Sequence, residues 1–430
     1  MQSALHAKAK EAPGFRFYAL YDKVYRKDVL AFAYQCCQAN GGVAGVDSQS
    51  FEDIEAYGVE RWLDELAQEL KSRTYRPLPV RRVYIAKPEG KPRPLGIPAI
   101  RDRVAETAAV LVLEPMFEAD LQPEQYAYRR DRSALDAVRA VHKLISTGHR
   151  EIVDADLSSY FDTIPHAELL RSVARRVADG AMLQLIKLWL EAPVEETDER
   201  GNKRRSTRNR DDRKGTPQGS PLSPLLSNLY MRRFVLGWKQ LGHEQRLKAR
   251  IVNYADDLVI CCRGRAQEAL VTMQDMMTRL KLTVNQAKTR VRTLPDEKFD
   301  FLGYTFGRCY SPQTGRAYLG TTPAKPRVQR IWEAISEATR RSQTQQTVEI
   351  LVAKLNREII GWANYFCLGP VSQAYRAVER HTRRRLRQWL CAKHKVPGAG
   401  TARYPDDILH EGFGLVRLSQ RTASFPWATA

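Results

Sequence analysis

Two adjacent acidic residues, Asp256 and Asp257, lie between two short apolar segments, and this arrangement restricts the possible folds more than any other feature. Residues 251–253 and 258–260 are rich in β-branched side chains, which favour strands, so the acidic pair is expected at a hairpin turn. Carboxylates at such a tip suit a hard cation such as Mg²⁺, which binds one or two carboxylates together with substrate phosphates. On these residues alone, a solvated Asp-Asp turn is the simpler interpretation.

A third carboxylate, Asp156, changes that interpretation. It follows a β-branched pair at 152–153, which predicts a strand, and precedes a polar turn and a helix expected to begin near Pro165. Placed beside the hairpin, it would complete a site for two divalent ions. In phosphoryl transfer such ions lie roughly 3.5–4 Å apart, activate the attacking oxygen and neutralise the leaving one. The predicted ligands are Asp156, Asp256 and Asp257.

Residues 215–224 read Gly-Thr-Pro-Gln-Gly-Ser-Pro-Leu-Ser-Pro, followed by an apolar segment up to Tyr230. The glycines and prolines predict a loop whose backbone approaches a ligand closely, and the residues after it predict a helix.

The order of these motifs resembles that of a reverse transcriptase of the bacterial group II intron type. The resemblance starts from Asp-x4-Phe at 156–161, the loop at 215–224 and Tyr-Ala-Asp-Asp at 254–257. Other segments resemble further parts of that family, and the resemblance runs from about residue 20 to the C-terminus. These are an N-terminal extension at 40–47, a fingers motif at 87–98, later palm motifs at 282–289 and 301–304, and a thumb or maturase motif at 361–366.

The resemblance implies an α+β right-hand polymerase, with fingers, an antiparallel palm sheet flanked by helices, a helical thumb and a small C-terminal DNA-binding segment. A chain of 430 residues with 43% hydrophobic content is long enough for several cores. Strand content is expected at 80–85, irregular structure at 87–98 and a linker at 322–326. The expected parts are 1–79 (N-terminal extension and start of the fingers), 80–149 (fingers), 150–322 (palm), 323–396 (thumb or maturase domain) and 397–430 (DNA-binding segment).

The implied activity is that of an RNA-directed DNA polymerase. A primer 3′-hydroxyl attacks the α-phosphate of a nucleotide and pyrophosphate leaves, so the protein supplies mainly positioning and charge neutralisation. Two Mg²⁺ ions are expected, with Mn²⁺ as a possible substitute. Asp156 and Asp256 would bridge both ions and Asp257 would support one of them, while the backbone carbonyl of Leu157 would add a ligand.

Other residues are candidates for binding the nucleotide. By resemblance, Lys87 and Arg93 would hold the triphosphate, with Lys91 as an alternative to Lys87. Gln218 would contact the template–nucleotide pair. Lys288 is a candidate proton donor to the departing pyrophosphate, with a solvated surface lysine as the equal alternative.

Phe161 lies five residues after Asp156, where related polymerases place an aromatic ring under the incoming sugar. A bulky ring there would clash with a 2′-hydroxyl, so it predicts use of dNTPs rather than rNTPs. Packing of Phe161 beneath the turn is compatible with that role.

A net charge of +20 and a pI near 9.7 favour a polyanionic partner. The expected partners are an RNA template with a DNA primer, held through backbone and A-form shape, together with the intron RNA and a target DNA. Binding that neutralises several phosphates weakens steeply with salt. At 128–133 the sequence Tyr-Arg-Arg-Asp-Arg-Ser replaces the family's usual Phe-Arg-Pro-Gly-Arg-Ser. The Pro-Gly turn of the family is missing here, so the resemblance does not establish template contacts at these residues. The candidate contacts are Arg129, Arg132, Lys203, Arg204, Arg205, Arg383, Arg384 and Arg387.

The location is expected to be the bacterial cytosol or nucleoid, without a membrane partner. No apolar run reaches the roughly 18 residues that a membrane span requires. Seven cysteines without a Cys-x-x-Cys pair suit a reducing compartment.

The leading hypothesis is an intron-encoded reverse transcriptase and maturase that binds its intron RNA, assists splicing and copies the intron at a DNA target. The chain reaches Ala430 without a His-Asn-His endonuclease pattern, so second-strand cleavage is not expected. One alternative is a domesticated relative in DNA repair, phage defence or a CRISPR array. Another is a non-catalytic RNA-binding splicing cofactor, against which the three carboxylates count. An RNA-dependent RNA polymerase is disfavoured by Phe161.

Overall fold

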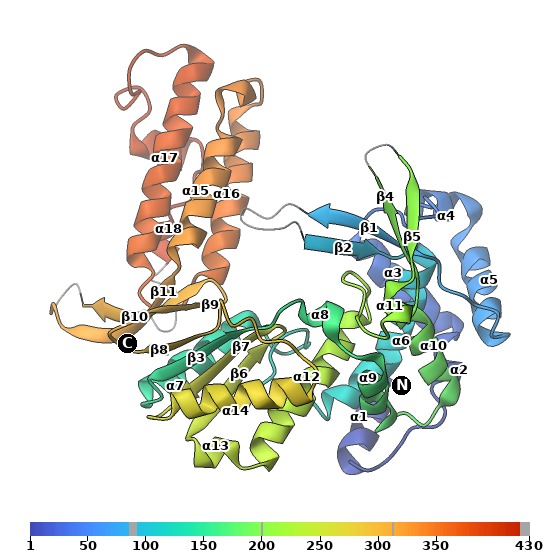
Figure 1. The fold of residues 1–430 in the computed structure, drawn as a ribbon. Coiled ribbons are helices and arrows are strands. Elements are labelled where there is room, and N and C mark those ends of the chain that lie inside the picture. The colour runs from blue at the N-terminus through green and yellow to red at the C-terminus, as the bar shows by residue number, and fades with distance from the viewer. Residues whose placement is uncertain (86–92, 199–200, 312–313, 422–430) are drawn as a thin grey trace. The chain divides into compact units, whose positions relative to one another are not determined.

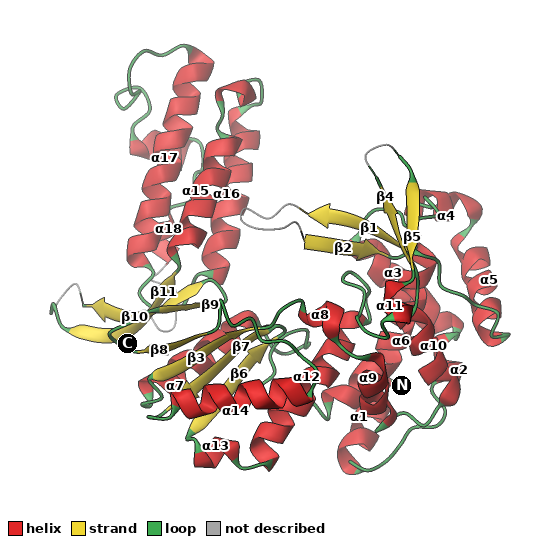
Figure 2. Ribbon diagram, viewed as in Figure 1, coloured by secondary structure: helices red, strands yellow, loops and turns green. Residues whose placement is uncertain are grey.

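The computed structural model describes residues 1–85, 93–198, 201–311 and 314–421, which fold as a mixture of helices and sheets (Figures 1 and 2). The chain forms two compact units. The first contains residues 1–133, 155–260 and 265–290, and the second contains residues 134–154, 261–264 and 291–430. The predicted α+β class is confirmed.

Helices dominate the N-terminal part of the first unit. The helix expected around 57–71 is α5, which buries Trp62, Leu63, Leu66 and Leu70 on one face. The φ of +104° at Gly58 separates it from α4. The bounds are α1 (Gln2–Glu11), α2 (Tyr21–Val24), α3 (Lys27–Asn40), α4 (Phe51–Tyr57), α5 (Val59–Lys71) and α6 (Ile100–Glu118).

A four-stranded sheet of the first unit has the order β2-β1-β4-β5. Its strands are β1 (Val80–Ile85), β2 (Arg93–Ile97), β4 (Val194–Thr197) and β5 (Lys203–Ser206). The predicted strand at 80–85 is confirmed, but irregular structure was wrong for residues 93–97, which pair antiparallel with β1. Because β2 lies at the sheet edge, Pro94 can join the strand without removing a ladder hydrogen bond. Residues 86–92 lie outside the described ranges.

A second four-stranded sheet, with the order β6-β7-β3-β8, holds the predicted carboxylates at its strand ends. The two strands expected around the acidic pair are confirmed as β6 and β7, and the helix expected near Pro165 begins at His166. The strands are β3 (Glu151–Asp156), β6 (Ala249–Tyr254), β7 (Asp257–Cys262) and β8 (Arg290–Thr293). The helices are α8 (Tyr160–Thr163), α9 (His166–Ala174), α10 (Gly180–Leu190), α11 (Arg208–Asp211), α12 (Ser223–Gln240), α13 (His243–Arg246) and α14 (Ala266–Arg279).

In the second unit, long helices share a core that includes Leu355, Tyr375 and Trp389. The prediction of a linker at 322–326 was wrong, because Pro323 ends a strand and Pro326 lies in the first turn of a helix. In that turn the missing N–H of proline costs no hydrogen bond. The elements are α7 (Ala134–Ser146), β9 (Phe299–Phe301), β10 (Tyr304–Tyr310), β11 (Ala317–Pro323), α15 (Lys325–Ala338), α16 (Val348–Tyr365), α17 (Ser372–His394) and α18 (Leu418–Arg421), with short 3₁₀ and π turns at Arg341–Gln343 and Ile408–Gly412.

Among the helices in the described ranges, none is both long and apolar enough to cross a membrane.

Candidate active site

Asp156 is the last residue of β3, and one short segment of the chain holds it in place. Its backbone N–H donates to Thr289 Oγ1 at 3.3 Å, and its carbonyl accepts from the backbone N–H of Asn285 at 2.8 Å. Its Oδ2 accepts from Asn285 Nδ2 at 3.0 Å and lies 3.7 Å from Lys288 Nζ. The side chain is 38% exposed, so the carboxylate is both oriented and accessible.

The turn between β6 and β7 carries the acidic pair. Asp256 and Asp257 are exposed, whereas Ala255 is buried with a left-handed φ of +56°. The fully buried Asn253 donates its Nδ2 to the carbonyl of Ala255 at 2.8 Å and so stabilises this turn. Asn253 was not singled out from the sequence, although an amide inside an apolar strand was the signal available.

The hairpin and the end of β3 belong to neighbouring parts of one sheet, because β7 lies next to β3 in its strand order. Tyr160, four residues after Asp156, has a pKa well above its ordinary value; burial is the main cause, followed by Tyr230 and the negative charge of Asp256. Asp256 therefore lies within electrostatic range of the chain segment that follows Asp156. The Tyr160 hydroxyl donates to the carbonyl of Ser227 at 2.6 Å and fixes this segment against α12.

The donor chemistry of these carboxylates fits a divalent cation, since Mg²⁺ prefers carboxylate oxygens and the side chains are half-exposed or exposed. Asp156 already attracts the ammonium group of Lys288. Within the described ranges, however, no three acidic, His or Cys side chains are gathered closely enough to form an ion site.

Leu157 continues the backbone of Asp156 into the interior. It is 4% exposed and pairs with Val284 in an antiparallel bridge, and Ser158 N–H donates to the carbonyl of Thr283 at 2.9 Å. Its role as a carbonyl ligand remains a prediction.

The loop at 215–222 is tied to the turn that carries Phe161. Phe161 is 8% exposed, and its carbonyl accepts from the backbone N–H of Thr216 at 2.8 Å. Gly215 donates its N–H to the carbonyl of Ile164 at 2.8 Å. The loop and the predicted sugar-contacting ring are thus parts of one local structure.

Further along, the loop contacts the edge strand β2. The side chain of Gln218 donates to Asp162 Oδ2 at 3.2 Å. The backbone carbonyl of Gln218 accepts from the backbone N–H of Gly96 at 2.6 Å. Arg93 begins this strand, and its backbone pairs with Ile85. Of the predicted triphosphate ligands, Lys87 and its alternative Lys91 lie outside the described residues.

A buried acid behind the loop was not predicted from the sequence. Glu106 of α6 is fully buried and accepts a hydrogen bond from Ser220 Oγ. Burial is the main cause that raises the pKa of Glu106 to about 8, against which the Ser220 hydrogen bond acts. One turn earlier, Asp102 accepts from the Tyr75 hydroxyl at 2.6 Å, and burial raises the pKa of Asp102 to about 6. Acidic residues within the apolar stripe of a helix were the available signal.

Two of the predicted nucleic-acid contacts after α6, Arg129 and Arg132, differ in exposure. The side chain of Arg129 is 7% exposed; it donates to Glu118 Oε1 at 3.0 Å and to the carbonyls of Gln122 and Gln125. The donors of Arg129 therefore stabilise the segment that follows α6. Arg132 is exposed and lies over the ring of Tyr126, 5.4 Å from its centroid.

The predicted basic run at 203–205 forms β5. Lys203 and Arg205 each pair with Glu195 of β4, at 3.3 and 2.8 Å, while Arg204 takes part in neither of these pairs and is exposed. Part of the positive charge in this hairpin is thus balanced internally.

The basic run on α17 is divided in the same way. Arg383 and Arg387 both pair with Asp406, and Arg387 also donates to the carbonyl of Tyr404 at 2.8 Å. Arg384 is exposed. Whether any of these basic residues contacts nucleic acid remains a prediction.

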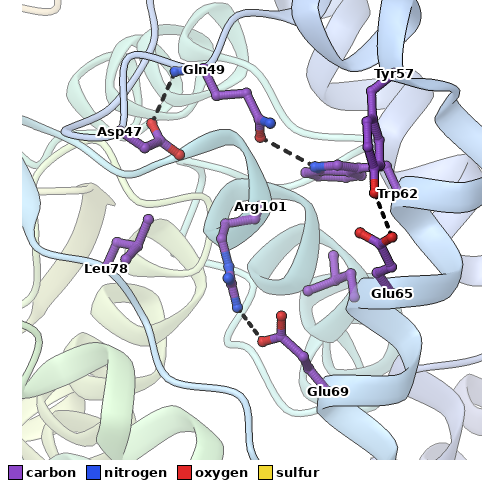
Figure 3. Close-up of a pocket in the computed structure, with 9 residues that line it drawn as sticks. Asp47, Gln49, Tyr57, Trp62, Glu65, Glu69, Leu78 and Arg101 are labelled. Carbon is purple, nitrogen blue, oxygen red and sulfur yellow. Dashed lines mark hydrogen bonds and ion pairs between the residues drawn. The ribbon is translucent and has the colours of Figure 1, made fainter.

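A separate pocket of about 400 Å³ lies in the N-terminal part of the first unit, and Figure 3 shows that its polar groups face one another. Trp62 Nε1 donates to Gln49 Oε1 at 3.2 Å, and Tyr57 donates to Glu65 at 2.6 Å. Arg101 pairs with Glu69. None of the predicted catalytic residues lines this pocket.

Comparison with known families identifies the class of protein. Residues 85–306 match the family described as reverse transcriptase (RNA-dependent DNA polymerase). Residues 328–404 match the group II intron, maturase-specific domain. The chain therefore belongs to the reverse transcriptase family.

The chain is also similar to individual proteins. The chain is 32% identical over 365 residues to protein YkfC of Escherichia coli (strain K12), a match that covers 75% of this chain and 92% of that protein. It is 34% identical over 228 residues to the group II intron-encoded protein LtrA of Lactococcus lactis subsp. cremoris, covering 52% of this chain and only 36% of LtrA. A solved structure, a partial Cas6-RT-Cas1–Cas2 complex, is 20% identical with a TM-score of 0.35, covering 61% of this chain and 41% of that one. The predicted group II intron type of reverse transcriptase with a maturase domain is confirmed.

Proposed function

We propose that the chain copies RNA into DNA by two-metal nucleotidyl transfer, with Asp156, Asp256 and Asp257 as the metal ligands. The observation that carries this proposal is the position of Asp156 at the end of β3, next in the sheet to β7, whose first residue is Asp257. Reverse transcriptases depend on divalent metal, and we expect two Mg²⁺ ions, which Mn²⁺ can replace. When bound, such ions activate the primer hydroxyl and neutralise the leaving pyrophosphate.

The residues around the carboxylates would orient the nucleotide. Arg93 and Lys87 would hold the triphosphate, and Gln218 would contact the template–nucleotide pair. The proximity of β2 to the Gln218 loop supports this arrangement, since one backbone hydrogen bond joins the two elements. Lys288 would protonate pyrophosphate; its side chain is 70% exposed, and its ammonium group lies 3.7 Å from Asp156 Oδ2.

The nucleic-acid partners would be an RNA template with a DNA primer, a group II intron RNA whose splicing and mobility the protein assists, and a target DNA. The exposed residues Arg132, Arg204 and Arg384 are the strongest candidates for phosphate contacts, because none of them is engaged in the ion pairs described above. The site of action would be the bacterial cytosol or nucleoid.

Primer extension on an RNA template in Mg²⁺ tests the proposal, with dNTPs and rNTPs compared for the wild type, Asp156→Asn and Asp256→Asn. Asp275→Asn on α14 is a matched control, because Asp275 is an exposed acid outside the site. We expect long DNA products from the wild type and the control, and a loss of extension on the order of 10²-fold or more in the two site variants.

Undiminished extension by Asp256→Asn would refute the assigned ligands. No extension by any variant, together with tight and salt-sensitive RNA binding, would instead support a non-catalytic splicing cofactor.

A further inference from the structure

Four arginines line a cavity of about 260 Å³ in the first unit, apart from the carboxylate site. Arg171 and Arg175 come from α9 and the residue that ends it, and Arg232 and Arg233 come from α12. We call this cavity the arginine pocket. None of the residues predicted to bind metal or nucleotide lines it.

The acidic residues of the arginine pocket are already paired. Asp120 lies 3.2 Å from Nε of Arg176, whose side chain is 3% exposed. Glu168 lies 2.7 Å from Nζ of Lys281. Arg176 and Lys281, which do not line the cavity, thus take up part of these negative charges. Asp120 also attracts the lining residues Arg232 and Arg175, and Glu168 attracts Arg171. The positive charge of the four lining arginines still exceeds the negative charge of the two carboxylates.

The guanidinium groups themselves have few acceptors. Within the described part of the chain, the side chains of Arg171 and Arg175 form no hydrogen bond or ion pair. Arg233 lies over the ring of Tyr230, 5.3 Å from its centroid, and its buried Nη1 has no hydrogen-bond partner among the described residues. Arg232 donates its Nε to the carbonyl of Asp120 at 2.6 Å. A buried donor without an acceptor, such as Nη1 of Arg233, is costly and therefore indicates a missing partner.

The charges around Arg232 also favour a bound anion. Burial is the main cause that lowers the pKa of Arg232; the negative charge of Asp120 opposes this shift, and the nearby charges of Arg175 and Arg176 add to it. An anion among these groups would relieve the repulsion between them. A planar guanidinium matches phosphate geometry with two parallel hydrogen bonds, and a phosphate offers more acceptor oxygens than a carboxylate does.

We infer that the arginine pocket binds a phosphate group, at a second anion site outside the polymerase site. Two sources share this chemistry: a phosphodiester of bound RNA, and a free polyphosphate for which pyrophosphate is the probe.

The test variant is Arg171→Gln/Arg175→Gln, which removes two exposed guanidinium groups that make no internal hydrogen bond or ion pair among the described residues. The control, Arg26→Gln/Arg61→Gln, removes two exposed charges of the same unit outside the cavity. One measurement is the thermal midpoint of the full chain with increasing pyrophosphate in EDTA. A ligand that binds only the folded state raises that midpoint. The other is RNA affinity against salt concentration, whose logarithmic slope falls by roughly 0.7–0.9 for each phosphate that the protein no longer neutralises.

A pyrophosphate-induced rise that disappears only in the pocket variant would assign a free polyphosphate. No such rise, with a shallower salt slope only in the pocket variant, would assign the RNA backbone. Equal behaviour of pocket variant and control in both measurements overturns the inference.

Ser172→Asp gives an independent check, because it adds a carboxylate to the cavity without removing an arginine; it should reproduce the loss seen in the pocket variant. Primer extension at low salt should persist in every variant. A failure of this inference is therefore distinguishable from a failure of the proposed polymerase site.

Discussion

The ring of Phe161 is buried against Tyr160, with centroids 5.6 Å apart, in the turn that follows Asp156. If this ring lies under the incoming sugar, Phe161→Ala should admit a 2′-hydroxyl and reduce the preference for dNTPs over rNTPs at least about tenfold, since removing one steric clash is worth roughly 1–3 kcal/mol. Single-nucleotide incorporation kinetics with each substrate measure this ratio. Phe306→Ala, which deletes another buried ring, in the second unit, controls for general destabilisation. An unchanged ratio would leave Phe161 with a packing role only.

Glu106 gives the fold a pH dependence that can be isolated. Its pKa is about 8 when folded and near its ordinary value of 4.5 when unfolded, so between these values only the unfolded state loses the proton. The free energy of unfolding should therefore fall as pH rises from about 4.5 to 8, by at most about 1.4 kcal/mol per pH unit, and level off outside that range. Glu106→Gln removes this contribution and keeps an acceptor for Ser220.

Urea unfolding of the wild type and Glu106→Gln at pH 5, 6, 7 and 8 checks this prediction. We expect the variant to gain stability relative to the wild type with each step. A difference that does not change with pH would mean that the buried carboxyl titrates near its ordinary value.

At the scale of elements, the contact between the 215–222 loop and β2 leaves no room for a side chain at Gly219. This glycine has a φ of +117°, and a Cβ added there would lie 2.1 Å from the carbonyl oxygen of Gly96. Gly219→Ala should displace the loop from β2, lower stability by about 1–3 kcal/mol and reduce nucleotide incorporation, mainly through KM. Steady-state primer extension and thermal unfolding measure the two effects.

Gly361→Ala is the matched control. Gly361 lies in α16 with open space around its position, so alanine should be neutral or should raise stability by about 0.5–1 kcal/mol. Equal effects of the two substitutions would show that the loop–strand contact has no influence on the reaction.

The same contact explains what the sequence could predict. The hairpin that carries Asp256 and Asp257 was predictable, because the acidic pair and the β-branched residues on either side of it are adjacent in the sequence. β2 was not, because its pairing with β1 decides the conformation of a proline-containing segment. The hydrogen bond between Glu106 and Ser220 joins residues that are 114 positions apart in the sequence. A local sequence pattern cannot predict a contact between residues so far apart.

At the scale of the whole molecule, the net charge of +20 does not show which positive side chains can contact RNA. Some arginines form ion pairs within the chain and are therefore less available to phosphates. On α17, Arg384 is exposed, whereas the side chain of Arg387 is 14% exposed and bound to Asp406 and Tyr404. Arg384→Gln should weaken RNA binding and reduce the salt slope by roughly 0.7–0.9 with little change in stability. Arg387→Gln should instead lower the thermal midpoint, since the carbonyl of Tyr404 loses its guanidinium donor and Asp406 keeps only its pair with Arg383.

Both variants lose one positive charge from the same helix, so each serves as the control for the other. Fluorescence anisotropy with a labelled RNA at several salt concentrations, together with thermal unfolding, separates the two effects. Equal loss of RNA affinity in both would show that net charge alone governs binding. A loss confined to Arg384→Gln would show that RNA contacts an arginine outside the internal ion pairs of this helix. On a strongly basic chain, a phosphate contact would then require a guanidinium group that no internal carboxylate already binds.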